Sequence, residues 1–299
     1  MNDLNIRLAC LADEAAVREL SSHIWEGEDY IPETFADWVA DPVGRFYLVL
    51  DGTRLAGFGK LSRLTAGEWW LEGLRVHPDF RGRGVARVLH DYAVALADEI
   101  GAGVLRFATA STNQATHHLA TSTGFALVSR YLLARGPALP AFSPPPLQRV
   151  KIAETAAAAA WLAQTDVRQW TADLYEDGWQ WFSLLPALPR LVAAERVYWW
   201  RGNAGMTITD TTHDPEEPER AWMNLAVTRH EADMPALLAD LRRLTARLGK
   251  ETMHGKPPAT PLMHEWLDAA GWSLSDDIEM FVFARPLPNA AATTSTSGV

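Results

Sequence analysis

The sequence is poor in cysteine, since its 299 residues include only Cys10. One cysteine excludes an intramolecular disulfide and cannot supply a cysteine-rich metal cluster, so we expect a fold without either and no metal. No apolar run approaches the roughly 20 residues of a membrane-spanning helix. The first residues also lack the basic segment and apolar core of a secretory signal. We therefore expect a cytoplasmic protein that does not enter a membrane.

Positive charge is also scarce: 27 Lys and Arg face 37 Asp and Glu, giving a formal net charge of −10. Nucleic-acid binding depends on basic side chains, so this balance argues against a nucleic-acid partner and weakly favours a cationic or neutral ligand. The 48% hydrophobic and 21% charged content is typical of a globular protein. The length suits one large domain or two of ordinary size.

The most informative segment joins a strand to a helix. Residues 69–76 are short, apolar and aromatic, which predicts a buried strand. His77 and Pro78 end it, because proline has no N–H for the ladder and restricts the preceding residue. Apolar residues then recur at helical spacing through 85–96.

Two glycines, Gly82 and Gly84, lie in the turn between that strand and that helix. Glycine lets the backbone approach an anion closely, and N–H groups at a helix start attract negative charge. The turn therefore predicts a site for a phosphorylated ligand. It is not a P-loop, because no lysine or hydroxyl follows Gly84. It is not a dinucleotide fingerprint either, because Arg87 stands where the third glycine is needed.

The spacing Arg81-x-x-Gly84-x-Ala86 resembles the acyl-CoA signature of the GNAT superfamily of N-acetyltransferases. The preceding residues 74–78 are similar to that family's fourth strand. The alternative is a plain strand-to-helix turn with solvated arginines. The resemblance implies acetyl-CoA as co-substrate, held mainly by backbone N–H groups of the turn. The implied cofactor-binding residues are Leu74, Val76, Arg81, Gly82, Arg83, Gly84, Val85, Ala86 and Asn113.

A later segment extends the resemblance to about residues 4–135. Asn113, a helical stretch and then Gly124-Phe125 resemble a second motif of the family, in which the asparagine is expected to bond the pantetheine arm. One departure concerns the chemistry. Many relatives carry a tyrosine seven residues after the asparagine that protonates the departing thiolate, and here that position is Ala120.

The composition changes at a run rich in proline, which favours an extended linker. We expect a GNAT domain at 1–136, a Pro-rich linker at 137–147, a second domain at 148–287 and a disordered tail at 288–299.

The second domain resembles a degenerate copy of the first. Residues 196–207 parallel 46–58 as strand, glycine turn and strand, and Gly271 parallels Gly124 at an offset of 147 (271 − 124). Chance agreement of common strand patterns is the alternative. Residues 228–235 contain no glycine and two carboxylates, so we expect no CoA site there. The predicted fold is α+β, with two tandem GNAT-like domains, each a mostly antiparallel twisted sheet flanked by helices.

Candidate residues for catalysis follow from the strand. Glu72 lies near its centre and is our preferred general base, acting directly or through water; the alternative is a structural carboxylate paired with an arginine. An acidic, aromatic loop between two predicted helices carries Trp25, Glu28 and Tyr30, which suit an amine acceptor because carboxylates and aromatic faces attract ammonium. A solvated helix connection is the alternative.

Together these features predict an N-acetyltransferase that moves acetyl from acetyl-CoA to a primary amine of a small molecule by direct attack. A peptide or protein N-terminus is the alternative acceptor. Ala120 keeps open a third possibility, a non-catalytic acyl-CoA sensor. We expect a monomer or homodimer.

Overall fold

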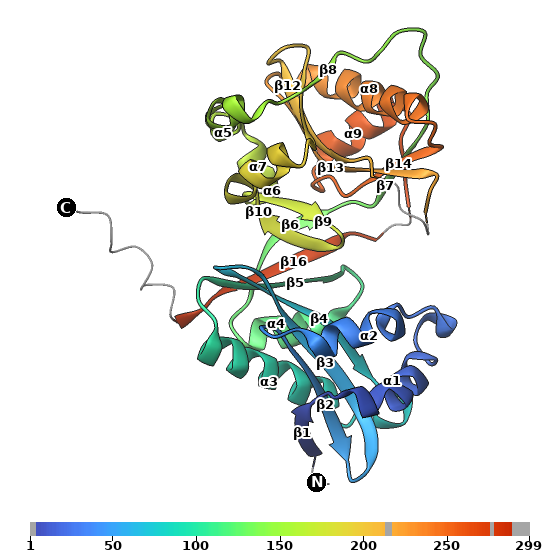
Figure 1. The fold of residues 1–299 in the computed structure, drawn as a ribbon, viewed down its shortest axis with the longest axis vertical. Helices are drawn as coiled ribbons and strands as arrows, with labels where there is room; N and C mark the ends of the chain where they lie inside the picture. Colours follow the sequence, from blue (N-terminus) through green and yellow to red (C-terminus); the bar gives the residue numbers. More distant parts are fainter. Residues whose placement is uncertain (1–3, 213–216, 276–277, 289–299) are drawn as a thin grey trace, which may run out of the picture. The chain divides into compact units, whose positions relative to one another are not determined.

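The computed structural model describes residues 4–212, 217–275 and 278–288. The chain divides into two compact units. The first unit comprises Met1–Phe107, Gln114–Ala126 and Phe283–Val299, and the second comprises Ala108–Asn113 and Leu127–Val282. Figure 1 shows the elements of both. Apart from Pro288, the tail predicted at 288–299 lies outside the described residues.

The first large sheet has seven strands in the order β1-β2-β3-β4-β5-β16-β6. Its elements and the helices between them are β1 (Leu4–Leu8), α1 (Glu14–Ser21), α2 (Ile31–Ala40), β2 (Arg45–Asp51), β3 (Arg54–Thr65), β4 (Glu68–Val76), α3 (Val85–Ile100), β5 (Val104–Ala110), α4 (Gln114–Ser122), β6 (Ala126–Tyr131) and β16 (Met280–Pro286). Short 3₁₀ turns, η1 (Leu11–Asp13), η2 (Trp25–Gly27) and η3 (Pro78–Phe80), connect some of them.

The second large sheet has the order β8-β11-β12-β13-β14-β7-β15. Its strands are β7 (Ala134–Pro137), β8 (Leu147–Arg149), β11 (Val197–Trp200), β12 (Gly205–Asp210), β13 (Arg220–Thr228), β14 (Thr252–Gly255) and β15 (Ser273–Leu274). The helices are α5 (Thr155–Ala163), α6 (Val167–Thr171), α7 (Leu184–Ala193), α8 (Met234–Arg247) and α9 (Pro261–Ala269). Strands β9 (Leu174–Asp177) and β10 (Gln180–Ser183) pair separately.

The two sheets repeat one topology. In each, the first four strands pair antiparallel, and the fourth then pairs parallel with the fifth: β4 with β5, and β13 with β14. A long helix, α3 or α8, connects the parallel pair, as parallel neighbours require a crossover. The predicted fold class is therefore confirmed: two mostly antiparallel sheets flanked by helices.

The sheets exchange one strand, and this changes the domain boundaries. The position beside the fifth strand is filled by β16 in the first sheet and by β7 in the second. The first sheet thus needs a strand from the chain's end, and Pro137, predicted in the linker, pairs with Thr252. The structure therefore differs from the predicted limits of 1–136, 137–147 and 148–287. Backbone pairing is largely independent of side-chain composition, so composition does not reveal which sheet a strand joins.

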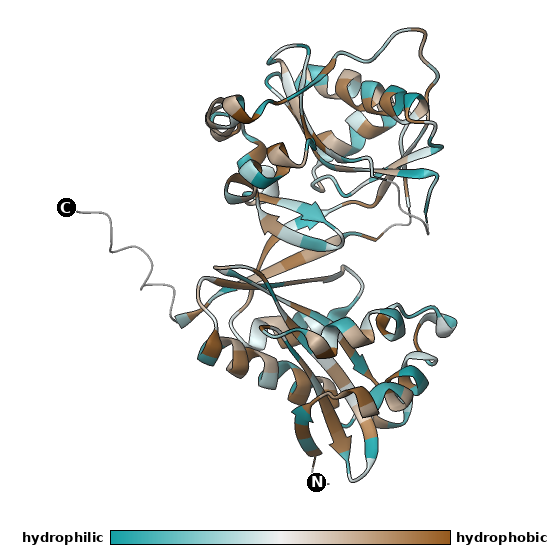
Figure 2. Cartoon of the chain, viewed as in Figure 1, coloured by the Kyte–Doolittle hydropathy of each residue, from teal (hydrophilic) through white to brown (hydrophobic). Residues whose placement is uncertain are grey.

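Helices cover both faces of the first sheet. Along β2, Phe46 and Leu48 pack with residues of α1 and α2, while Tyr47 and Val49 pack with α3. Successive strand residues point to opposite faces, so the continuous apolar run of β2 reflects burial on both sides. In Figure 2 the polar and apolar segments alternate along α3, as expected for a helix with one face on a sheet.

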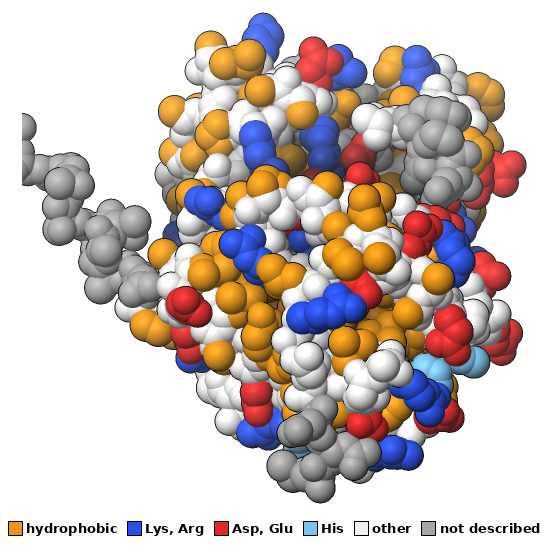
Figure 3. Space-filling view, turned by 60° about the horizontal axis from the view of Figure 1, so that its bottom comes forward, with side chains coloured by type: hydrophobic (Ala, Val, Ile, Leu, Met, Phe, Trp, Pro, Cys, Tyr) orange, Lys and Arg blue, Asp and Glu red, His pale blue; other side chains and the backbone are white. Residues whose placement is uncertain are grey.

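Among the described residues, no helix combines the length and apolar character needed to cross a membrane. On the face drawn in Figure 3, lysine and arginine side chains are interspersed with aspartate and glutamate.

Candidate active site

The glycine turn lies immediately before α3 and has the backbone geometry that only glycine adopts readily. Gly82 has φ +73° and Gly84 φ +80°. A Cβ added at either position would meet no atom within 4 Å, so the space above the turn is open. The first N–H groups of α3, beginning at Val85, have no acceptor within the helix. The turn therefore presents donors toward open space, and its residues fit a diphosphate.

Buried side chains hold the turn in place. The ring of Phe80 is 3% exposed and Val85 is 1% exposed, which anchors the turn on both sides. Two guanidinium groups lie against the Phe80 ring: Arg54 at 5.0 Å and Arg83 at 5.2 Å from its centroid. Both predicted phosphate-binding arginines, Arg81 and Arg83, are exposed, and Arg83 also lies against the Phe80 ring.

A β-bulge interrupts β4 beside the turn. Phe58 pairs with Arg75 and Lys60 with Glu72, so Gly73 and Leu74 together oppose a single residue of β3. Gly73 has φ +63°, and a Cβ there would lie 2.5 Å from the Trp38 ring. Only glycine therefore fits the bulge.

Strand β4 leaves its parallel partner, β5, before it reaches the bulge. Within the described residues, its pairing with β5 runs only from Glu68–Val104 to Trp70–Arg106. The part of β4 that holds Leu74 and Val76 lies past the end of this ladder. That the backbone groups on this edge bond the pantetheine arm stays a prediction.

Glu72 is half-buried and lies one residue before the bulge glycine. Its Oε1 accepts a hydrogen bond from the Ser62 hydroxyl. Desolvation, with a further contribution from the Glu72 carboxylate, raises the pKa of Tyr30 to about 12. The structure thus brings the predicted base near one of the three predicted acceptor residues.

The predicted acceptor loop contacts β4 through a residue that sequence reasoning missed. The Arg75 guanidinium binds Asp29 with two hydrogen bonds, Nη2 to Oδ1 at 3.0 Å and Nε to Oδ2 at 3.2 Å. It also lies 4.5 Å from the Trp25 ring centroid and 5.9 Å from that of Tyr30. Arg75 therefore occupies the cation position that we assigned to the acceptor amine. The signal was a single arginine within an otherwise apolar strand end.

The remaining predicted residues are placed as follows. Glu28 and Trp25 are exposed, Trp25 at 61%. Asn113 donates from Nδ2 to Thr109 Oγ1 at 3.1 Å and belongs to the second unit, so its contact with pantetheine stays a prediction. Ala120 is fully buried within α4.

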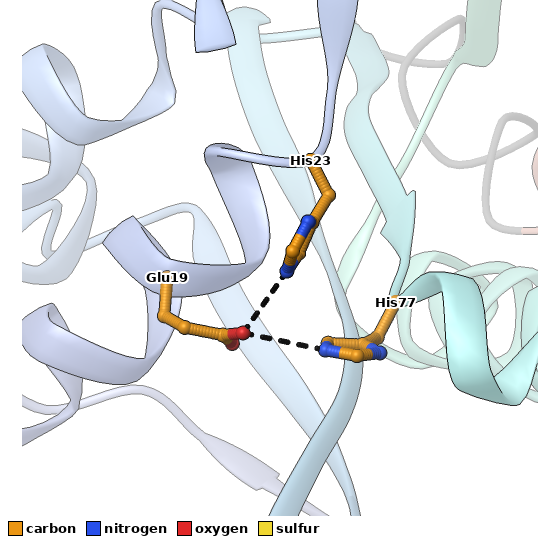
Figure 4. A group of neighbouring side chains, drawn as sticks. All are labelled: Glu19, His23 and His77. Atoms are coloured by element: carbon orange, nitrogen blue, oxygen red, sulfur yellow. Dashed lines mark hydrogen bonds and ion pairs between the residues drawn. The ribbon is translucent and has the colours of Figure 1, made fainter. Parts of the chain in front are cut away.

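A second group of polar side chains was not predicted. Glu19 from α1, His23 just after it and His77 at the end of β4 point toward one another, as Figure 4 shows. One side-chain nitrogen or oxygen atom from each of the three residues lies within 4.8 Å of the other two. Glu19 and His23 are one helical turn apart, but His77 is distant in sequence, so spacing alone gave no sign of the group.

Comparison with known proteins agrees with this geometry. Residues 14–125 match the Acetyltransferase (GNAT) family. The human protein "Probable N-acetyltransferase 16" is 34% identical over 89 residues, which covers 29% of this chain and 24% of that protein. The match thus spans about a quarter of the human protein's length.

Two solved structures share the fold over nearly the whole chain. The GCN5-related N-acetyltransferase from Sphaerobacter thermophilus has a TM-score of 0.63 at 14% identity, covering 95% of both chains. A tandem GNAT protein from the clavulanic acid biosynthesis pathway has a TM-score of 0.55 at 16% identity, covering 95% of this chain and 98% of that one. This chain therefore carries a GNAT acetyltransferase domain in its N-terminal part and has the fold of a tandem GNAT protein.

Proposed function

We propose that the first unit transfers an acetyl group from acetyl-CoA to a primary amine of a small molecule. The observation that carries this proposal is the open glycine turn before α3, next to a strand whose bulge and divergence leave its edge accessible. N–H groups from Gly82 to Ala86 hold the diphosphate, with Arg81 and Arg83 nearby. The pantetheine arm follows the edge of β4 at Leu74 and Val76.

Acetyl transfer requires an oriented amine, a polarised carbonyl and a proton acceptor. The amine nitrogen attacks the thioester carbon, the new C–N bond forms, and the C–S bond breaks to release the CoA thiolate. Backbone N–H groups of the bulged strand polarise the carbonyl oxygen, and Glu72 takes the amine proton directly or through water. A thiol has a reference pKa near 8.5, so the thiolate takes its proton from solvent without a tyrosine at position 120.

The acceptor side is formed by Trp25, Glu28 and Tyr30. Arg75 already occupies the aromatic faces and the Asp29 carboxylate. Because Arg75 neutralises Asp29, the wall of the site that this loop forms carries less negative charge than the loop's sequence indicates. We propose that a neutral amine, or one that also bears a carboxylate, suits this wall better than a polycation.

Among the described residues, the corresponding place in the second unit holds only a small cavity. Strand β13 pairs with β14 from Arg220–Thr252 to Met223–Gly255. Past this point lies a cavity of about 10 Å³, lined partly by Tyr131, Asn224 and Lys256. That is space for about one water molecule. Lys256 is buried beside it and paired with Glu176 at 2.8 Å. We propose that this unit does not bind CoA.

The test is calorimetric titration of the full chain with acetyl-CoA. Gly84→Glu obstructs the turn and adds a repelling charge, so we expect at least a hundredfold loss of affinity. Gly52→Glu is the matched control, because Gly52 has φ +64° and equally open surroundings in the β2–β3 turn. Equal affinity in the two variants would refute the site. Free-thiol release across a panel of amines then identifies the acceptor.

The buried Ala120 favours one further candidate, a CoA-binding sensor without chemistry. A sensor binds acetyl-CoA but releases no thiol with any amine. Thiol release that depends on a peptide N-terminus, and on no small amine, would instead support the peptide acceptor.

A further inference from the structure

His77 connects β4 to the glycine turn of residues 81–84, which we call the phosphate turn from here on. Its ring is buried, 7% exposed, and its Nδ1 accepts a hydrogen bond from the backbone N–H of Asp79 at 3.2 Å. This bond caps η3 by giving the Asp79 N–H an acceptor, since Pro78 has no N–H and the Phe80 N–H bonds the His77 carbonyl. The chain continues from η3 through Arg81 into Gly82. The ring of His77 therefore fixes the start of the turn that we propose binds acetyl-CoA.

Charged groups face both sides of this ring. Its Nε2 lies 3.5 Å from Glu19 Oε1, and the Nε2 of His23 approaches the same oxygen at 3.1 Å. The two imidazole rings meet edge-on with centroids 5.3 Å apart (Figure 4). On the other side, Asp79 Oδ2 lies 4.0 Å from His77 Nδ1. Arg54 binds that same carboxylate oxygen at 2.8 Å.

The bond from Asp79 determines where the ring carries its hydrogen. A backbone N–H only donates, so Nδ1 of His77 is unprotonated and the hydrogen of the neutral ring is on Nε2, directed at Glu19. A metal ion on Nε2 requires that hydrogen to move to Nδ1, where it would meet the N–H of Asp79. The geometry therefore favours a proton over a metal ion at this group.

We propose that His77 is a proton-responsive positioning residue for the phosphate turn, an inference that rests on the proposed function. The neutral ring takes up a proton only at Nδ1, which breaks the bond from the Asp79 N–H. The new Nδ1–H turns to the Asp79 carboxylate, in competition with Arg54. Glu19 and Asp79 offset the imidazolium charge, so loosening of the turn outweighs any added attraction for phosphate. Acetyl-CoA affinity consequently falls as His77 is protonated.

The experiment measures the affinity of the full chain for acetyl-CoA between pH 8 and pH 5.5, the range in which imidazoles titrate. His77→Asn keeps a side-chain oxygen that accepts from the Asp79 N–H but does not titrate. We expect the wild type to lose about three- to tenfold more affinity than this variant on acidification, the effect of one hydrogen bond. The affinity of His77→Asn also changes with pH when the phosphate groups of CoA titrate, so its profile serves as the baseline for the wild type. His118→Asn, an exposed histidine on α4, should behave as the wild type.

The outcomes are distinct. Parallel pH profiles in the wild type and His77→Asn would overturn the inference, because a purely structural role lowers affinity equally at every pH. If neither binds acetyl-CoA at any pH, the proposed function fails. In that case the role of His77 is tested by NMR of the free protein. The chemical shift of the Asp79 amide should change over this pH range in the wild type and remain constant in His77→Asn. Zinc binding that is lost in Glu19→Gln would favour a metal site and overturn the proton assignment.

Discussion

Arg75 and Asp29 form a buried, two-point ion pair, with Nη2–Oδ1 at 3.0 Å and Nε–Oδ2 at 3.2 Å. The Asp29 side chain is fully buried and that of Arg75 is 13% exposed. The pair ties the loop after α1 to the end of β4, which is the segment next to the phosphate turn. A charge pair at this place holds the acceptor side and the cofactor side of the candidate site together.

Removal of either Arg75 or Asp29 should therefore lower the stability of the folded protein. Asp29→Ala leaves the Arg75 guanidinium buried without its carboxylate, and we expect a loss of about 3 kcal/mol in the free energy of unfolding. Glu28→Ala, at the exposed neighbouring position, should stay within about 0.5 kcal/mol of the wild type. Urea denaturation followed by fluorescence makes the comparison, and equal midpoints for the two variants would contradict the structural role.

Glu72→Gln keeps the shape of the side chain and removes its basicity. If Glu72 accepts the amine proton, we expect acyl transfer near neutral pH to fall about a hundredfold while acetyl-CoA affinity stays nearly unchanged. Steady-state thiol release and calorimetry separate the two effects. Glu33→Gln, exposed on α2, serves as the control. A wild-type rate for Glu72→Gln would remove this residue from the mechanism.

Acid stability provides another test, through Asp13. Hydrogen bonds from the Arg7 side chain lower the pKa of Asp13 to about 2 from its usual 3.8. Because the folded-state pKa is depressed, the stabilisation is present above about pH 4 and is lost as the pH falls toward 2. The difference in thermal midpoint between the wild type and Asp13→Asn should shrink over that interval. Asp37→Asn, exposed on α2, should show no such change.

The exchanged strand predicts a long-range effect on stability. Phe283 on β16 is 3% exposed and stacks on Phe107, with ring centroids 5.3 Å apart and an interplanar angle of 13°. Phe283→Ala should cost the first unit about 3–5 kcal/mol. Phe142→Ala, fully exposed, is the matched control and should be nearly neutral. Thermal unfolding with and without acetyl-CoA measures the stability of both variants. An unchanged midpoint for Phe283→Ala would contradict this packing.

Fragments cut at the predicted boundaries should fail for the same reason. Residues 1–136 lack β16, and residues 148–287 lack β7, so each sheet would miss an internal strand. Two broken ladders leave backbone groups unpaired and apolar side chains exposed. We expect both fragments to aggregate, as judged by size-exclusion chromatography. A folded, monomeric 1–136 that binds acetyl-CoA would show that β16 is dispensable.

The glycine turn was predictable from the chain alone because its determinants are local, while its binding of phosphate stays a prediction. Two glycines at the required spacing, a proline that ends a strand and an apolar helical repeat are contiguous in sequence, and each follows from backbone sterics. The repeated order of strands was predictable for the same reason, since both halves carry similar patterns. The bulge at Gly73 involves only a few residues, yet it depends on register with β3, which local patterns do not specify.

The partners of charged side chains and the placement of two strands were decided by tertiary structure. Asp29 meets Arg75, and Glu19 meets His77, across distances that no motif encodes. Such pairs depend on which elements pack together, and the free energy gained is a property of the buried geometry rather than of either residue. The exchange of β7 and β16 is of the same kind, because any extended segment can satisfy an open ladder and only the folded chain selects one.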